Sequence, residues 1–203
     1  GVEEVVLLAG HLFQHLQSFT TELPIQLPKP VTVKISCEPS PAGTGGAIWH
    51  ARDFLDERFL LVNGDSWFDT NLTRFIAQAP PNGLAHILLA RVDDASRYGI
   101  VQLAGSRIVA FHERPQRRTS GTINAGVYLL QKKIVEFLKP ACSIEKDVLP
   151  QLADTGHLTG TAAEGYFIDI GIPADYARAA AEIPQRLRRP AVFFDRDGVL
   201  NED

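Results

Sequence analysis

Residues 60–65 read Leu-Leu-Val-Asn-Gly-Asp, and this stretch decides how the rest of the chain is interpreted. An apolar run that stops at a glycine and ends on a carboxylate is typical of a buried strand that carries Asp65 to the carboxyl edge of a sheet. Ligands of open α/β sheets bind at that edge. Because Asn-Gly-Asp also suits an ordinary turn, a turn residue without a function is the plainer interpretation of Asp65.

Two more segments point to the same kind of site. Residues 43–46 read Gly-Thr-Gly-Gly and precede a helical pattern, so that the glycines let the backbone approach a ligand and Thr44 can cap the helix. Asp169 ends the apolar run of residues 166–168. Two strand-end carboxylates and a glycine-rich helix start predict a site for Mg²⁺ and a phosphorylated nucleotide. A plain glycine-rich turn with a threonine cap is the alternative for 43–46.

The composition narrows the class of protein. With 203 residues, of which 45% are hydrophobic, the chain can bury one substantial core. A net charge of −4 gives no field that would attract nucleic acid, and no apolar stretch approaches the ~20 residues that span a bilayer. Cys37 and Cys142 are too few for a disulfide framework and indicate reduced thiols. We therefore expect a soluble cytoplasmic enzyme with no nucleic-acid or membrane partner.

The order of strand and helix patterns predicts an α/β fold. We expect a Rossmann-like mixed, mostly parallel sheet flanked by helices, with a β-rich insertion over the site between residues 98 and 130. The strand patterns cover residues 3–9, 31–37, 59–62, 85–91, 100–103, 108–111, 123–130 and 167–170. The helical patterns cover residues 12–19, 47–55, 72–79, 132–138, 144–153 and 174–188.

Several short motifs occur in a fixed order along residues 1–185. They are Glu38 with Gly-Thr-Gly-Gly-Ala at 43–47, Val-Asn-Gly-Asp at 62–65, Tyr-Gly at 98–99, Phe-His-Glu-Arg-Pro at 111–115, Asn-Ala-Gly-Val-Tyr at 124–128, Ser-Ile-Glu-Lys-Asp at 143–147 and Asp-Ile-Gly at 169–171. Together they resemble the sugar-phosphate nucleotidyltransferases, which join a sugar 1-phosphate to a nucleoside triphosphate. The resemblance implies the fold of nucleotide-diphospho-sugar transferases.

The resemblance also implies a role for each matching residue. In this chemistry an oxygen of the sugar phosphate attacks the α-phosphorus in line and pyrophosphate leaves, which requires positioning and charge neutralisation. Asp65 and Asp169 would be catalytic through the Mg²⁺ that they hold. The nucleotide would contact Glu38, Gly43, Thr44, Gly45, Gly46 and Asp65. The sugar would contact Tyr98, Gly99, Glu113, Arg114, Asn124, Gly126 and Glu145.

Two of these positions carry a reservation. The alternative interpretation of Glu145 is a solvated acid in the first turn of a helix, where the helix dipole favours it. Arg114 stands where many members carry lysine, and its planar fork differs from the point charge of an ammonium.

One motif of the family is absent from these 203 residues, namely the glycine-rich loop whose arginine grips the triphosphate. The resemblance places Gly1 after that loop and places the missing first strand in the middle of the sheet. We therefore expect an internal fragment of a longer protein, with unpaired strand edges and negligible turnover by itself.

The tail of the sequence resembles a different family. Residues 193–201 read Phe-Phe-Asp-Arg-Asp-Gly-Val-Leu-Asn, like the first motif of haloacid-dehalogenase-type phosphatases, particularly the heptose bisphosphate type. The resemblance implies that Asp195 attacks phosphorus, that Asp197 acts as general acid and base, and that both lie at a Mg²⁺ site. A turn or EF-hand-like acid cluster is the alternative. The expected domains are residues 1–189, a nucleotidyltransferase, and 190–203, a truncated phosphatase.

The two resemblances together suggest one pathway. A phosphatase would remove one phosphate from a sugar bisphosphate, and the transferase would activate the remaining anomeric phosphate. This favours heptose 1-phosphate as the sugar and synthesis of surface polysaccharide, such as lipopolysaccharide, as the purpose. Guanine is the base favoured by resemblance, and the oligomeric state is not indicated. A glycosyltransferase of related fold and a sugar-nucleotide-binding regulatory module remain alternatives.

Overall fold

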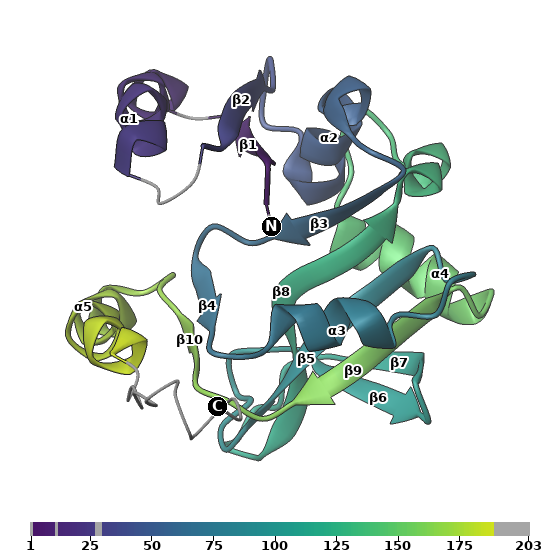
Figure 1. The fold of residues 1–203 in the computed structure, drawn as a ribbon. Helices are drawn as coiled ribbons and strands as arrows, with labels where there is room; N and C mark the ends of the chain where they lie inside the picture. Colours follow the sequence, from purple (N-terminus) through teal and green to yellow (C-terminus); the bar gives the residue numbers. More distant parts are fainter. Residues whose placement is uncertain (1, 11, 27–29, 189–203) are drawn as a thin grey trace, which may run out of the picture.

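The computed structural model describes residues 2–10, 12–26 and 30–188 (Figure 1). The strands are β1 (Glu4–Ala9), β2 (Thr32–Cys37), β3 (Arg58–Val62), β4 (Ser66–Phe68), β5 (Ala85–Val92), β6 (Ile100–Ala104), β7 (Arg107–His112), β8 (Gly121–Gln131), β9 (Leu158–Ala163) and β10 (Phe167–Asp169). The α-helices are α1 (Phe13–Gln26), α2 (Gly43–His50), α3 (Leu72–Gln78), α4 (Leu149–Asp154) and α5 (Pro173–Leu187). Short 3₁₀ turns, η1 (Arg52–Phe54) and η2 (Lys132–Phe137), and one π turn, η3 (Ile144–Val148), complete the chain. None of the described helices is long and apolar enough to cross a bilayer.

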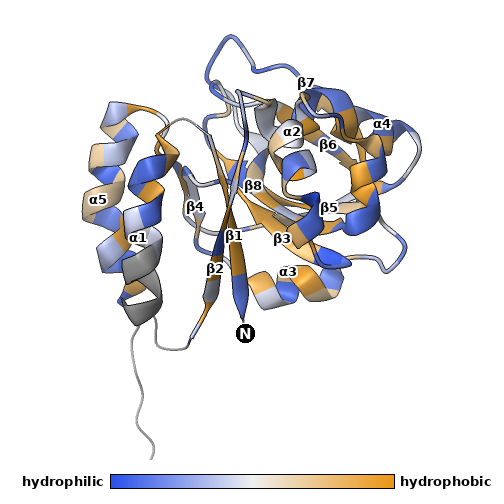
Figure 2. Ribbon diagram, turned by 90° about the horizontal axis from the view of Figure 1, so that it is seen from above, coloured by the Kyte–Doolittle hydropathy of each residue, from blue (hydrophilic) through white to orange (hydrophobic). Residues whose placement is uncertain are grey.

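A six-stranded sheet in the order β3-β8-β5-β9-β7-β6 forms the body of the fold. Figure 2 shows α3 on one face of this sheet and α2 with α4 on the other. The α/β class with a mixed sheet and flanking helices is confirmed. The expected predominance of parallel pairs is wrong, because only β1–β2 and β5–β9 are parallel among the described pairings. Alternation of strands and helices does not reveal that β8 runs antiparallel to both β3 and β5.

The strands between residues 98 and 130 belong to the main sheet and do not form a separate insertion. β8 lies between β3 and β5. The β6–β7 hairpin forms the far edge, and the sheet curls so that Ile100 of β6 also pairs with Ile123 of β8. The long β8 strand can therefore reach both ends of the curled sheet.

Two strands escaped prediction because their residues carry no strand pattern. β9 reads Leu-Thr-Gly-Thr-Ala-Ala, small residues with no alternation, yet it lies between β5 and β7. Its Gly160 is closely packed, since a Cβ there would lie 3.1 Å from Ile108 and from Leu89. β4 has three residues and pairs with β10. Close packing, and not propensity, makes these segments strands.

β1 and β2 form a separate parallel pair. Among the described strands, β1 pairs only with β2, and β3 pairs only with β8, so each has one edge without a partner. The expected unpaired edges are thus present. The missing strand that would explain them stays a prediction, as does the truncated domain of residues 190–203, which lies outside the described residues.

The core has one layer on each face of the sheet. Ile87, Leu89 and Leu130 pack with Ile144 and Leu149 on the face that α2 and α4 cover. On the α3 face, Phe75 packs against a second cluster, whose members are Leu88, Ala90, Ala95, Ile123, Ala125, Val127 and Leu129. Each fully buried large side chain contributes roughly 1.5–3 kcal/mol.

His86 of β5 is a buried polar residue within this core. It is 3% exposed, stacks on Phe75 and makes two hydrogen bonds, one between Nδ1 and the Thr159 hydroxyl (2.7 Å) and one between Nε2 and the Thr161 hydroxyl (3.0 Å). Because the Thr159 hydroxyl also donates to the Ala85 carbonyl, this pattern assigns the ring proton to Nδ1. Burial lowers the pKa of His86 to about 4, so the imidazole is neutral in the folded protein.

We expect this histidine to make the fold sensitive to acid. The unfolded chain takes up a proton near pH 6.5, whereas folded His86 resists protonation until about pH 4. The unfolded state therefore binds more protons in that window, and the free energy of unfolding should decrease by about 3 kcal/mol as the pH falls through it. Urea unfolding at pH 7, 5.5 and 4 measures this. His86→Gln should flatten the dependence, whereas exposed His112→Gln should leave it unchanged; equal slopes for both variants would contradict the assignment.

Candidate active site

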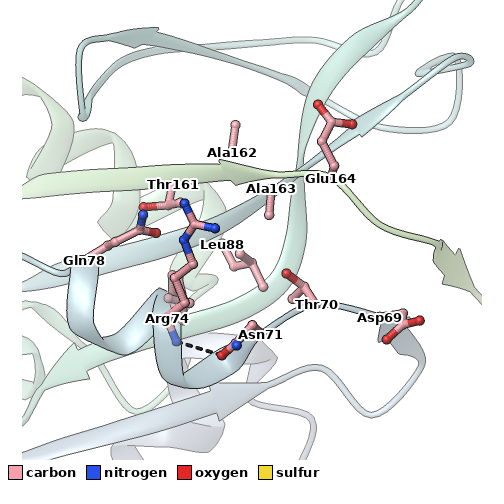
Figure 3. Close-up of a pocket in the computed structure, with 11 residues that line it drawn as sticks. Asp69, Thr70, Asn71, Arg74, Gln78, Leu88, Thr161, Ala162, Ala163 and Glu164 are labelled. Atoms are coloured by element: carbon pink, nitrogen blue, oxygen red, sulfur yellow. Dashed lines mark hydrogen bonds between the residues drawn. The ribbon is translucent and has the colours of Figure 1, made fainter. Parts of the chain in front are cut away.

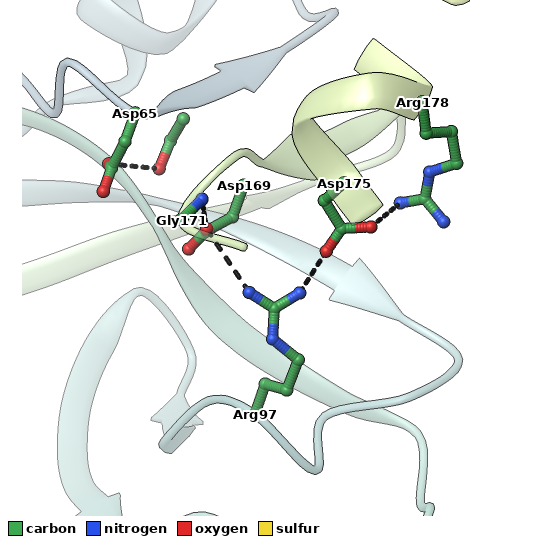
Figure 4. Close-up of polar contacts among 7 residues, drawn as sticks. Asp65, Arg97, Asp169, Gly171, Asp175 and Arg178 are labelled. Carbon is green, nitrogen blue, oxygen red and sulfur yellow. Dashed lines mark hydrogen bonds and ion pairs between the residues drawn. The ribbon is translucent and has the colours of Figure 1, made fainter. Parts of the chain in front are cut away.

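The structure brings Asp65 and Asp169 together from distant parts of the chain. β3 ends at Val62, and Asp65 lies in the turn that leads into β4. β4 and β10 pair antiparallel with Asp169 opposite Ser66, and the N–H of Ile170 donates to the Asp65 carbonyl (2.8 Å). The two acids therefore lie on neighbouring stretches of backbone (Figure 4).

Each acid has one carboxylate oxygen engaged. Asp65 Oδ1 accepts from the Ser66 hydroxyl (3.3 Å). Asp169 Oδ1 accepts from the N–H of Gly171 (2.8 Å) and lies 3.5 Å from Arg97 Nη2. Oδ2 of both acids is without a partner among the described residues. Within that part of the chain no three acids, histidines or cysteines gather, so an ion held by this pair would take further ligands from substrate or water.

The glycines of residues 43–46 are required by packing inside the protein. The N–H groups of Gly45 and Gly46 both donate to the Cys142 carbonyl (2.9 and 3.1 Å). A Cβ on Gly43 would lie 2.7 Å from that same oxygen, and one on Gly46 would lie 2.7 Å from the Pro140 carbonyl. The close approach that these glycines permit is thus to residues 140–143, and contact with a nucleotide stays a prediction.

The prediction that Thr44 caps the following helix is wrong. α2 begins at Gly43, and no side chain caps it. Thr44 Oγ1 instead accepts from the N–H of Ile144 (3.0 Å) and donates to Glu145 Oε2 (2.6 Å). The glycines let the start of α2 pack directly against residues 140–143. This packing places Thr44 next to the start of η3.

Glu38 supports the turn before α2. Its Oε2 accepts from the N–H of Ala42 (3.2 Å), and its carboxylate fills the space beside Gly10, where a Cβ would lie 2.4 Å from Oε1.

A hydrogen-bond network joins several of the predicted residues. Besides Thr44, Glu145 accepts from the Ser143 hydroxyl (2.9 Å) and from the Tyr128 hydroxyl (3.4 Å). Tyr128 in turn accepts from the Asn124 amide (2.8 Å). Glu145 does lie in the first turn of η3, as the alternative interpretation expects, but it is half-buried and its carboxylate is hydrogen-bonded to protein groups. Its three donors come from α2, β8 and the start of η3, so it ties these elements together.

Tyr128 is a site residue that sequence reasoning missed. It is 1% exposed, and burial, followed by the neighbouring Glu145, raises the pKa of its hydroxyl, which stays protonated as a donor. A signal was present, because Tyr128 follows Asn124 by four positions on a strand, where alternation predicts a shared face.

Gly126 forms the bulge that shapes this part of β8. The β5 partners step from Val127 to Asn124, leaving Ala125 and Gly126 unpaired in that ladder. Gly126 has φ 73°, and its carbonyl accepts from the N–H of Asn63 (2.8 Å), just before Asp65. Bulges commonly re-aim side chains beside active sites.

Of the remaining residues predicted to contact the sugar, Tyr98 lies beside Asp169, whereas Glu113 and Arg114 are exposed after β7. Half-buried Tyr98 packs edge-on against Phe167 (ring centroids 5.8 Å apart), beside Asp169. Gly99 approaches the His112 carbonyl, 3.1 Å from where its Cβ would be. Exposed Glu113 and Arg114 follow β7 and make no ion pair or side-chain hydrogen bond with other described residues. The phosphatase candidates Asp195 and Asp197 lie outside the described residues.

A separate cavity of about 750 Å³ opens between α3 and β9 (Figure 3). Its lining includes the polar side chains of Arg74, Gln78 and Thr161 and the apolar side chains of Phe75 and Leu88. None of the predicted site residues lines it.

The chain has an α/β fold with two strand-end acids on neighbouring stretches of backbone. Residues 2–186 match the family model described as nucleotidyl transferase, so the chain belongs to the nucleotidyl transferase family. The crystal structure of HddC from Yersinia pseudotuberculosis superposes with a TM-score of 0.79 at 30% identity, covering 90% of this chain and 80% of that one. That protein is also known in complex with GMP-PN, with a TM-score of 0.76.

Two curated relatives differ in how much of their length the chain covers. D-glycero-alpha-D-manno-heptose 1-phosphate guanylyltransferase from Aneurinibacillus thermoaerophilus is 32% identical over 187 residues, which are 90% of this chain and 79% of the relative. Mannose-1-phosphate guanylyltransferase 1 from Arabidopsis thaliana is 34% identical over 191 residues, which are 87% of this chain. The chain spans about half the length of that plant relative (50%).

Proposed function

We propose that this chain carries the catalytic site of a sugar-1-phosphate guanylyltransferase, which transfers GMP from GTP to heptose 1-phosphate and releases pyrophosphate. The observation that carries the proposal is that the backbones of Asp65 and Asp169 lie next to one another through the pairing of β4 with β10. Both relatives are named for guanylyl transfer, which supports the base, and the relative from Aneurinibacillus thermoaerophilus is named for heptose 1-phosphate, which supports the sugar.

The two acids fit a divalent cation such as Mg²⁺. Carboxylate oxygens are the ligands that Mg²⁺ prefers, and the ion is usually held by one or two carboxylates together with substrate phosphates. Oδ2 of each acid has no described partner and is available for this. When bound there, the cation would neutralise charge on the reacting phosphates and polarise the α-phosphoryl group.

The residues of the chain itself would supply orientation. A sugar phosphate is already an anionic nucleophile, so no side chain has to remove a proton from it, and catalysis depends on alignment and charge. Glu145 fixes Thr44 on the proposed nucleotide side and, through Tyr128, Asn124 on the proposed sugar side. Relative movement of the two substrates would thus require breaking this network.

A substrate panel tests the proposal. We expect the natural protein with GTP and Mg²⁺ to release pyrophosphate fastest with D-glycero-D-manno-heptose 1-phosphate, measured by coupled pyrophosphate detection. Preference for glucose or mannose 1-phosphate would contradict the sugar, and preference for another triphosphate would contradict the base. Binding of a nucleotide sugar without any turnover would favour the regulatory module instead.

A link to sugar-bisphosphate dephosphorylation and a role in surface polysaccharide synthesis belong to the same proposal. Hydrolysis of a heptose bisphosphate by the natural protein would test the link.

A further inference from the structure

Arg97 lies between two carboxylates that belong to different elements (Figure 4). It comes from the connection between β5 and β6, and its guanidinium contacts Asp175 in the first turn of α5 and Asp169 at the end of β10. The contact of Nη1 with Asp175 is the closer one, whereas Nη2 stays 3.5 Å from Asp169. The Arg97 guanidinium is therefore shared unequally between the two carboxylates, in favour of Asp175.

Asp175 is well placed to retain the Arg97 guanidinium. Its side chain is 13% exposed, and its other oxygen, Oδ1, lies 3.1 Å from Arg178 Nη2. Both carboxylate oxygens thus face arginines, which offsets the cost of burying the charge. The Arg97 side chain is 39% exposed, and its Nη2 points toward Asp169 (Figure 4).

We propose that Asp175 is a positioning residue for Asp169, and that it acts by holding the Arg97 guanidinium away from that carboxylate. The inference rests on the proposed function, in which Asp169 is a ligand of the divalent cation. An arginine fork fits a carboxylate through two parallel hydrogen bonds. Without Asp175, Arg97 closes on Asp169 in this way, occupies the oxygen that the cation needs and places an uncompensated positive charge beside it.

Mn²⁺ affinity, measured by electron paramagnetic resonance on the natural protein without nucleotide, tests this directly. Asp175→Asn keeps the size of the side chain and should weaken Mn²⁺ binding about tenfold, because a carboxylate that is paired with an arginine through two hydrogen bonds is a poor ligand. Adding Arg97→Gln to this variant should restore the affinity to within about threefold of the unmodified protein, since the competing cation is then gone. Damage to the local structure alone would not be repaired by a second substitution.

Arg178→Gln is the matched control, because it removes the other arginine of Asp175 without touching Asp169; it should change Mn²⁺ affinity less than about twofold. The proposal is overturned if Asp175→Asn binds Mn²⁺ normally, or if the double variant binds no better than the single one. Should Asp175→Asn not fold, Arg97→Gln alone decides: unchanged or tighter binding is expected, and a tenfold loss would overturn the proposal. Normal Mn²⁺ binding by Asp65→Asn and Asp169→Asn would instead refute the metal site of the proposed function.

Discussion

Asp65→Asn should reduce nucleotidyl transfer by the natural protein on the order of a thousandfold or more. The change removes one of the two carboxylates that would hold the cation, and with it the charge neutralisation on which phosphoryl chemistry depends. The amide keeps the size of the side chain, and because Asp65 is exposed its fold should be unaffected. Single-turnover rates at saturating GTP and sugar 1-phosphate measure the effect, and the thermal midpoint checks the fold.

Asp56→Asn serves as the control for this variant. Asp56 is also exposed and lies before β3, at the opposite end of the strand that leads to Asp65. The control removes the same charge from a position next to the same strand but away from Asp169, so its rate should stay within about twofold of the unmodified rate. Turnover by Asp65→Asn within tenfold of the control would show that this acid does not hold the catalytic cation.

How far the sequence predicted the fold depended on local signals. Apolar runs bounded by turn residues located β1, β3, β5 and β10 closely. β9 was not found, because its pairing with β5 depends on small residues that fit between Leu89 and Ile108. Strand direction was also beyond reach, since no local feature states that β8 runs against both of its neighbours.

The site shows the same division between local and tertiary information. The strand-end positions of Asp65 and Asp169 are local, and the pairing of β10 with β4 then makes their backbones neighbours. The contacts of Thr44 are tertiary, because they depend on how α2 seats against η3. Arg97 had no local signal at all. Its partner Asp175 is met only when the β5–β6 connection and α5 approach one another.

Gly43→Ala should destabilise the protein by about 2–5 kcal/mol, the sum of two effects of similar size. Gly43 has φ 75°, a conformation that costs a residue with a Cβ about 1 kcal/mol or more. The new methyl group would also lie 2.7 Å from the Cys142 carbonyl oxygen, which accepts from both Gly45 and Gly46. Moving that carbonyl away breaks these two hydrogen bonds, which form the seam between the start of α2 and residues 140–143 before η3. Overpacking of this kind costs typically 1–3 kcal/mol.

Gly105→Ala separates the two effects. Gly105 lies in the β6–β7 turn with φ 62°, and a Cβ there would meet nothing within 4 Å, so only the backbone term of about 1 kcal/mol remains. Urea unfolding of both variants gives the difference, which measures the close approach at Gly43. Because the same seam holds Thr44 against Glu145, Gly43→Ala should also raise the KM for GTP, whereas Gly105→Ala should not. Equal destabilisation by the two substitutions would show that the seam yields to the methyl group and does not fix the position of Thr44.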